Sequence, residues 1–108
     1  MVRATEARVV LVTCGSLDEA RKIAKVVVEK RLAACVNVIS APVESVYWWK
    51  GKVESAKEIL LVIKTTALRL KDLEKEIAKA HSYEMPEFLV LGVIGGSKKY
   101  LGWLTGNV

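Results

Sequence analysis

The order in which extended and helical patterns follow one another restricts the fold of this chain more than any other feature of its sequence. Residues Arg8–Thr13 form a run rich in β-branched side chains, which predicts a central strand covered on both faces. Ser16 and Glu19 then match a capping box, in which the serine accepts an early helix amide and the glutamate reaches back to the cap. Apolar residues recur at helical spacing from Ala20 onward, so a helix is expected to about Lys30.

The middle of the chain returns to an extended pattern that predicts one long hairpin. The first strand begins at Cys35–Ile39, is interrupted by Pro42, and resumes over Val43–Trp49. Proline cannot donate to a sheet ladder, so it predicts a bulge or an edge at this point. Turn chemistry at Lys50–Gly51 then leads to a second apolar strand over Ile59–Lys64.

The last third of the chain repeats the order of helix and strand. The expected elements are a helix over Leu70–Ala80 after a Thr66 cap, a strand over Glu87–Ile94, a turn at Gly95–Gly96, and a short helix after Ser97.

This order predicts an α+β fold of the ferredoxin-like βαββαβ type, with a long hairpin between its second and third strands and a short C-terminal helix. All 108 residues are expected to form a single domain, because the chain is too short for two ordinary cores. Both long helices would cover one face of a four-stranded antiparallel sheet. The other face would be apolar and uncovered, which predicts an oligomer.

Charge and hydropathy argue against two classes of partner. The chain has 17 basic and 12 acidic side chains, and the basic residues are spread from Arg3 to Lys99 without a dense cluster. This favours a solvated surface over a nucleic-acid-binding stripe. No apolar run reaches the ~18 residues that a membrane-spanning helix needs, so no membrane association is expected.

Cysteine and amide usage give two further expectations. Cys14 and Cys35 do not make a disulfide framework, and the fold would place another strand between them, so both thiols are expected to be reduced and the protein cytoplasmic. The chain has no Gln and only two Asn, whereas Lys and Glu supply 22 residues. That bias favours a thermostable, charged surface.

Five segments, taken together, carry a family resemblance over nearly the whole chain. They are Arg31–Asn37 (RLAACVN), Tyr47–Gly51 (YWWKG), Glu58 through Lys64–Thr65, His81–Tyr83 (HSY) with Pro86–Glu87, and Tyr100–Trp103 (YLGW). In this order and spacing the sequence resembles the CutA divalent-cation tolerance family. The resemblance implies a homotrimer of ferredoxin-like subunits, in which the long hairpin extends a neighbour's sheet. It also implies binding of copper or another divalent cation, a part in metal tolerance, and no established catalytic activity.

The resemblance directs attention to three candidate metal ligands. Cys35 offers a soft thiolate suited to copper(I) or zinc, although a buried cysteine is more often a small core residue. His81, the only histidine, offers an imidazole nitrogen, and its alternative role is to cap the second helix. Glu87 would supply a carboxylate. One imidazole and one or two thiols cannot supply the three or four ligands of a stable site within one subunit without carboxylates or waters. Two alternatives therefore stay open: a site shared between subunits that uses Cys35, His81 and Glu87, and a weak surface site.

A second function remains open at this stage. The resemblance implies that Asn37, Tyr47 and Lys64 approach a cleft between subunits, together with His81 and Glu87. A lysine at the end of an apolar strand needs an acid or an anion beside it, and Lys64 could find either Glu58 or Glu87 in a structural salt bridge or a bound anion. The alternative is therefore a signalling module similar to the trimeric PII-type proteins, which binds a small anionic ligand in that cleft. A third possibility is a scaffold without a ligand.

The aromatic residues near the hairpin turn are expected at the trimer interface. Tyr47 and Trp49 would lie on one face of their strand and Trp48 on the other. A nucleic-acid platform would also need a basic groove and a glycine-aromatic signature, which Ile59–Lys64 lacks. Trp48 and Trp49 are therefore predicted to anchor one subunit on another. No arrangement of residues typical of hydrolytic catalysis is present, so the protein is not expected to be an enzyme.

Overall fold

The computed structural model describes residues 1–3 and 5–108 and has three α-helices, a short 3-10 helix and six strands. In chain order the elements are β1 (Val2–Arg3), β2 (Ala7–Cys14), α1 (Leu17–Glu29), β3 (Cys35–Trp49), β4 (Lys52–Thr66), η1 (Ala67–Arg69), α2 (Leu70–Ala80), β5 (Leu89–Gly92), β6 (Gly95–Gly96) and α3 (Lys98–Gly106).

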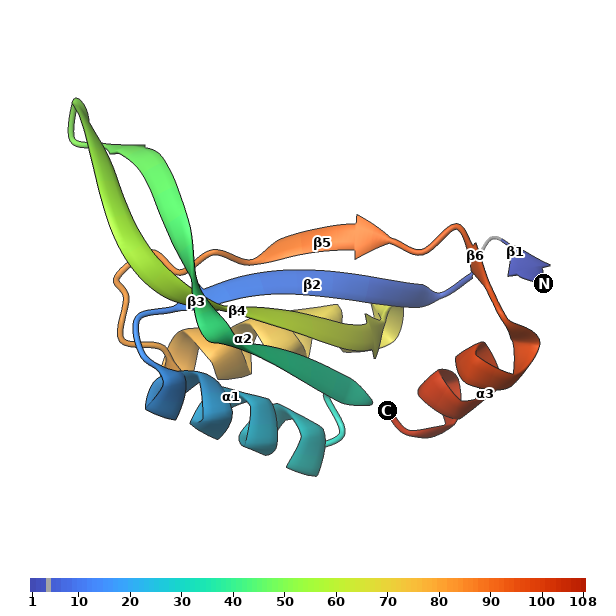
Figure 1. The fold of residues 1–108 in the computed structure, drawn as a ribbon. Coiled ribbons are helices and arrows are strands. Elements are labelled where there is room, and N and C mark those ends of the chain that lie inside the picture. The colour runs from blue at the N-terminus through green and yellow to red at the C-terminus, as the bar shows by residue number, and fades with distance from the viewer. Residues whose placement is uncertain (4) are drawn as a thin grey trace.

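The main sheet has four antiparallel strands in the order β3-β4-β2-β5, with α1 and α2 side by side beneath it (Figure 1). This arrangement confirms the predicted ferredoxin-like α+β fold with a long hairpin and a C-terminal helix. As predicted, β4 separates the strands that carry Cys14 and Cys35, and both cysteines are free.

The hydrophobic core lies between the sheet and the two long helices. Val10 and Val12 of β2 and Leu61 and Ile63 of β4 point into it and are fully buried. Ile23, Val27, Leu73 and Ile77 meet them from α1 and α2. Burial of about ten aliphatic side chains at roughly 25 cal/mol per Å² of apolar surface is the main source of stability.

The other side of the sheet, which we call the open face, carries the alternate residues of the same strands. Val9 and Leu11 of β2 and Leu60 and Val62 of β4 lie there and are only partly buried. The expectation that Arg8–Thr13 is covered on both faces is therefore wrong for the single subunit. Its position inside the sheet, between β4 and β5, is as predicted.

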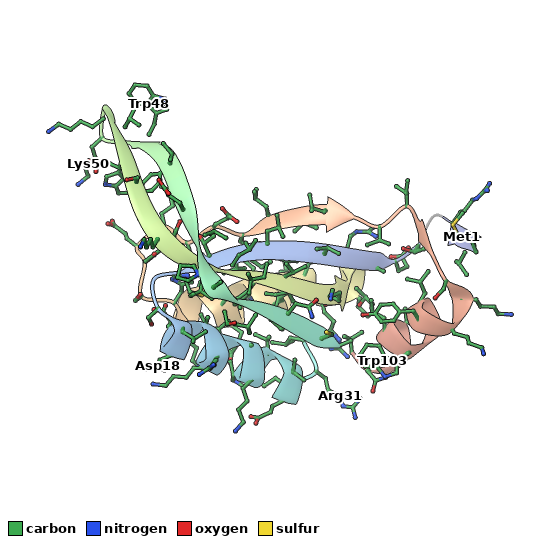
Figure 2. All side chains as sticks on the ribbon, viewed as in Figure 1. Met1, Asp18, Arg31, Trp48, Lys50 and Trp103 are labelled. Atoms are coloured by element: carbon green, nitrogen blue, oxygen red, sulfur yellow. The ribbon has the colours of Figure 1, made fainter. Side chains whose placement is uncertain are left out.

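The long hairpin extends well beyond the sheet (Figure 1). The pairing of β3 with β4 shifts between Ile39 and Val43, around Pro42, which confirms the predicted bulge. Lys50 and Gly51 form the turn with φ of 51° and 79°, the left-handed conformation that a tight hairpin requires. Figure 2 shows Trp48 and Lys50 at the tip of this arm.

Three local predictions need correction. Ser16 caps α1 by accepting the N–H of Glu19 at 3.2 Å, but the Glu19 carboxylate accepts hydrogen bonds from Ser82 instead of returning to the cap. Thr66 is the last residue of β4 and makes no side-chain cap bond, because a 3-10 turn separates it from α2. Gly95–Gly96 is not a simple turn, since its backbone pairs with β1.

The expected strand Glu87–Ile94 is shorter in the structure and covers Leu89–Gly92. Glu87 instead belongs to the segment that connects α2 to β5, and this places it beside the hairpin. In the described part of the chain no helix is long and apolar enough to cross a membrane.

Candidate functional site

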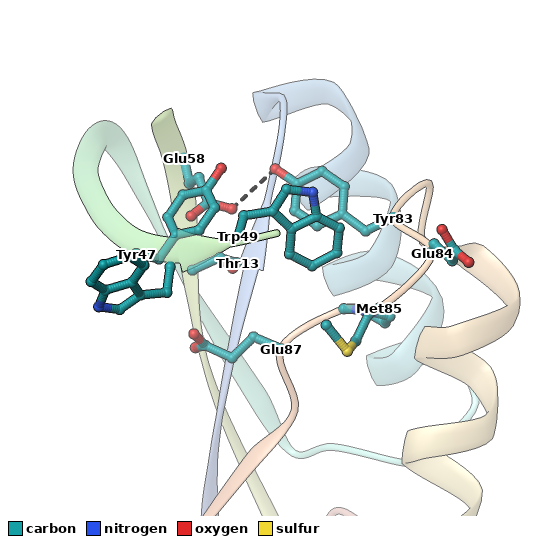
Figure 3. Close-up of a pocket in the computed structure, with 10 residues that line it drawn as sticks. Thr13, Tyr47, Trp49, Glu58, Tyr83, Glu84, Met85 and Glu87 are labelled. Carbon is teal, nitrogen blue, oxygen red and sulfur yellow. Dashed lines mark hydrogen bonds between the residues drawn. The ribbon is translucent and has the colours of Figure 1, made fainter. Parts of the chain in front are cut away.

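A pocket of about 530 Å³ opens where the hairpin, the end of β2 and the segment after α2 meet (Figure 3). Ten residues line it: Thr13, Tyr47, Trp48, Trp49, Glu58, Tyr83, Glu84, Met85, Pro86 and Glu87. The register of β3 with β4 places Tyr47, Trp49 and Glu58 on one face of the hairpin and Trp48 on the other, as the alternation of a strand predicts.

The charge of this pocket is negative. Three of its lining residues are glutamates, and none of the ten is Lys, Arg or His. Glu58 is 9% exposed. Burial, and then the nearby charge of Glu58, raises the pKa of Glu87 above its ordinary value of 4.5. Two carboxylates that oppose each other's ionisation favour a proton or a cation between them.

Tyr83 provides the hydrogen-bond donor inside the pocket. Its hydroxyl donates to Oε2 of Glu58 at 3.0 Å, as the dashed line in Figure 3 shows. Burial, and then the bonded Glu58 carboxylate, raises the pKa of Tyr83 to about 12, so the phenol stays neutral at physiological pH. Behind it, burial together with the charges of Glu19 and Glu58 raises the pKa of the Cys14 thiol to about 11. Cys14 is therefore poorly suited to act as a thiolate ligand.

His81 lies behind the pocket, at the C-cap of α2 as predicted, and its side chain is fully buried. Its Nε2 is 2.7 Å from the carbonyl oxygen of Thr13, and its Nδ1 accepts the backbone N–H of Tyr83 at 3.0 Å. Ligation of a metal by His81 would require the loss of one of these bonds.

Cys35, Asn37 and Lys64 form a second group on the open face. Nζ of Lys64 donates to Oδ1 of Asn37 and lies 3.9 Å from Sγ of Cys35. Lys64 and Glu58 share a face of β4 and are six residues apart, a separation of about 20 Å along a strand. This basic group and the acidic pocket therefore lie at opposite ends of the open face.

The structure thus divides the predicted site residues. Glu87, Tyr47, Trp48 and Trp49 line the pocket, whereas Cys35, Asn37 and Lys64 lie at the other end and His81 lies behind. Within residues 1–3 and 5–108, no three His, Cys, Asp or Glu side chains are arranged to hold a metal ion.

Sequence reasoning gave too little weight to Glu58 and Tyr83. Glu58 entered only as a partner of Lys64, and Tyr83 only as part of the HSY segment. Period-two spacing over residues 58, 60, 62 and 64 places Glu58 on the same face as Lys64, so this signal was present. No sequence signal pairs Tyr83 with Glu58, because the contact joins two elements through a loop.

A model of the CutA1 divalent ion tolerance protein family matches residues 8–107. The chloroplastic protein CutA of Arabidopsis thaliana is 45% identical over 92% of this chain, which spans 54% of the plant protein's length. The solved divalent cation tolerance protein of Thermus thermophilus is 42% identical, with a TM-score of 0.91 over 94% of this chain and 97% of its own.

A solved CutA from Archaeoglobus fulgidus, described as a periplasmic divalent cation tolerance protein, is 37% identical, with a TM-score of 0.87 over 91% of this chain and 94% of its own. The names of these proteins refer to tolerance of divalent cations and not to a catalysed reaction. The predicted resemblance is confirmed, and the chain belongs to the CutA1 divalent ion tolerance protein family.

Proposed function

We propose that this protein is a cytoplasmic homotrimer that binds a divalent cation, with copper as the expected ion, and that it contributes to metal tolerance without catalysing a reaction. The observation that carries the cation reading is the acidic pocket, where Glu58 and Glu87 face an opening without a basic residue among those that line it. Membership of a divalent ion tolerance family supports the same reading.

Assembly is supported by the apolar residues at the edge of the sheet. Within residues 1–3 and 5–108, β5 pairs only with β2, and its Leu89, Val90 and Leu91 are all exposed, as is Ile94 after it. Exposed apolar side chains at a sheet edge are typical of an interface between proteins. Trp48 and Trp49 on the projecting arm are the proposed anchors, since large aromatic side chains contribute strongly at the centres of interfaces.

The opposite charges of the two ends support a head-to-tail contact between copies. Lys64 lies at one end of the open face, and Glu58 and Glu87 lie near the other. A heterologous contact that joins unlike ends closes into a ring when its rotation permits, and three copies are proposed here. In such a ring the Cys35 thiol of one copy approaches Glu87 of the next.

The proposed ligands are therefore Glu87 and a Cys35 from a different copy. This fits the expectation of a site shared between subunits, because the two residues do not meet within one subunit. His81, the third predicted ligand, has both ring nitrogens engaged inside its own subunit, so the proposed site does not depend on it.

A specific observation also favours the anion alternative. Lys64 and Asn37 contact each other on the open face, where an ammonium and an amide could hold a small anion. Tyr47 would join them only from another copy, because it lies ten residues further along β3.

A competitive titration with copper(I) and copper(II) tests the proposal on the parent protein, Cys35→Ser, Glu87→Gln and His81→Ala. Glu44→Gln is the matched control, because Glu44 is an exposed carboxylate on the opposite face of the hairpin from Glu58. Tight binding in an intact trimer that either Cys35→Ser or Glu87→Gln abolishes supports the shared site. Weak copper binding that survives all substitutions, together with phosphate binding lost in Lys64→Gln, supports the anion alternative instead.

A further inference from the structure

The ring of His81 has a fixed arrangement of donor and acceptor. Nδ1 accepts the N–H of Tyr83 at 3.0 Å, so this nitrogen carries a lone pair and no proton. Nε2 lies 2.7 Å from the carbonyl oxygen of Thr13, which can only accept. The neutral ring protonated at Nε2 satisfies both bonds, and the fully buried side chain also places Nδ1 3.4 Å from Oε1 of Glu19.

The two groups that His81 joins both belong to the pocket. Thr13 lines it from β2, and Tyr83 lines it from the segment after α2. The imidazole also packs against the Tyr83 ring, with centroids 4.7 Å apart. The Tyr83 hydroxyl then reaches Glu58 on β4 at 3.0 Å. A continuous set of contacts therefore runs from the end of β2 through His81 and Tyr83 to the acidic centre of the pocket.

Two neighbouring features hold the same segment. Ser82 donates its backbone N–H and its hydroxyl to the Glu19 carboxylate, at 2.7 and 2.8 Å, and so ties the segment to the start of α1. Gly15 leaves room for Tyr83, because a Cβ at that position would lie 3.1 Å from the Tyr83 hydroxyl oxygen. These contacts fix residues 81–83 on the body of the subunit, and the Tyr83 side chain is directed from there.

We propose that His81 is a positioning residue of the cation site, which acts by holding Tyr83 in hydrogen-bonding contact with Glu58 and not as a metal ligand. The inference rests on the proposed function in taking the acidic pocket as part of the cation site. It goes beyond the proposed function because it gives His81 an indirect role that acts through Tyr83. His81 is the single histidine and the residue that best resembles a metal ligand in this sequence.

A double-mutant cycle on zinc(II) affinity tests this role with His81→Ala, Tyr83→Phe and the double variant, each checked for oligomeric mass and melting temperature. If His81 acts through Tyr83, each single change weakens binding by about fivefold, the effect of one lost hydrogen bond, and the double variant is no weaker than either. Multiplied losses in the double variant would overturn the proposal, because a ligand contributes independently of the phenol.

His81→Asn keeps the test usable if His81→Ala fails to fold. The asparagine side-chain oxygen can accept the N–H two residues further on and thus replaces the Nδ1 contact. Zinc affinity within about twofold of the parent supports positioning, whereas affinity as weak as that of His81→Ala contradicts it.

Ring ¹⁵N NMR provides a readout that does not depend on affinity. The metal-free protein should show a neutral His81 protonated at Nε2, and added zinc(II) should leave both ring-nitrogen signals in that tautomer. A zinc-induced shift of either ring nitrogen by coordination would refute the inference. If the parent binds no zinc or copper, the proposed function fails, and the tautomer together with the His81–Tyr83 contact is still read directly from the same spectra.

Discussion

The two ends of the open face differ in charge, in chemistry and in how their polar groups are held. At the pocket end, Glu58 is nearly buried and bonded to Tyr83, which is held in turn by His81. At the other end, Lys64 contacts only its strand neighbours Asn37 and Cys35 among its side-chain partners in the described residues. The acidic end is supported by several elements, whereas the basic end depends on two adjacent strands. This difference indicates that the polar groups are held more rigidly at the acidic end than at the basic end.

The largest expected effect comes from reversing charge at one end only. Lys64→Glu or Glu87→Lys should each place like charges together across the proposed contact, at a cost of several kcal/mol. We expect each single variant to dissociate, and the double reversal to recover the trimer. Light scattering measures this as a mass near 11.9 kDa against one three times larger. Lys71→Glu on α2 is the control, and a double variant that stays monomeric would contradict the contact.

Removal of an aromatic anchor should have the next largest effect. Trp49→Ala should weaken assembly by about 2–4 kcal/mol, the range for a central aromatic interface residue. Trp103 on α3 is a matched control, since it is 46% exposed in the subunit against 41% for Trp49. Light scattering at decreasing protein concentration should show a lower mass for Trp49→Ala than for the control variant Trp103→Ala. A Trp49→Ala protein that assembles like the parent would contradict the proposed anchoring role of Trp49.

Thermal unfolding of the parent protein tests the expected thermostability. The parent is expected to melt above about 65 °C, beyond the usual mesophilic range.

Loss of the Tyr83 hydroxyl should destabilise only the pocket end. Tyr83→Phe removes one hydrogen bond to a buried carboxylate, with an expected loss of about 1–2 kcal/mol in the free energy of unfolding. Asn37→Ala, at the basic end, removes a bond to a more exposed lysine and should change stability by less than about 0.5 kcal/mol. Urea unfolding of both variants measures the difference, and equal losses would show that the two ends are supported alike.

The smallest effect is on pH dependence. Burial and the charge of Glu58 raise the pKa of Glu87, so this group takes up its proton more readily in the folded protein. As pH falls through the interval just above 4.5, cation affinity should decrease while Glu87 protonation adds stability.

Glu19 has the opposite sign. Burial alone would raise its pKa, but the two hydrogen bonds from Ser82 lower it below 4.5. The stability that it contributes is present above 4.5 and is lost as pH falls through the lowered value. Glu87→Gln should remove only the stability that is gained as pH falls, and Glu19→Gln only the stability that is lost as pH falls. Unfolding curves between pH 3 and 6, roughly the range of carboxyl titration, would measure both effects.

The backbone order was predictable because each element carries its own periodic signal. The buried residues of β2 and β4, the α1 cap at Ser16 and the bulge around Pro42 all follow from local sequence. The pairing of Gly95–Gly96 with β1 has no such signal, since glycine offers no side-chain pattern and the contact is made by backbone alone.

The candidate site was predictable only in its residue types. The sequence predicts Glu87 as a metal ligand, Tyr47 as a cleft residue and Trp49 as an interface residue, and it does not predict the bond from Tyr83 to Glu58, which joins residues 25 positions apart. Glu19 shows the same limit: its spacing from Ser16 suits a capping box, yet its carboxylate binds Ser82, 63 residues away. Tertiary contacts decide between competing hydrogen-bond partners, and local spacing does not reveal which one is available.

The turn at the tip of the hairpin combines an unfavourable backbone conformation with a charged side chain. Lys50 holds a left-handed backbone conformation, which costs a residue with a Cβ about 1 kcal/mol and which asparagine adopts more readily. The Lys50 ammonium lies 5.9 Å from the centre of the Trp49 ring, so the side chain recovers part of that strain through a cation–π contact. Lys50→Asn should relax the backbone and remove the positive charge from the arm. Lysine at this position therefore places a positive charge beside the aromatic side chains of the tip, in a turn that is not the most relaxed one.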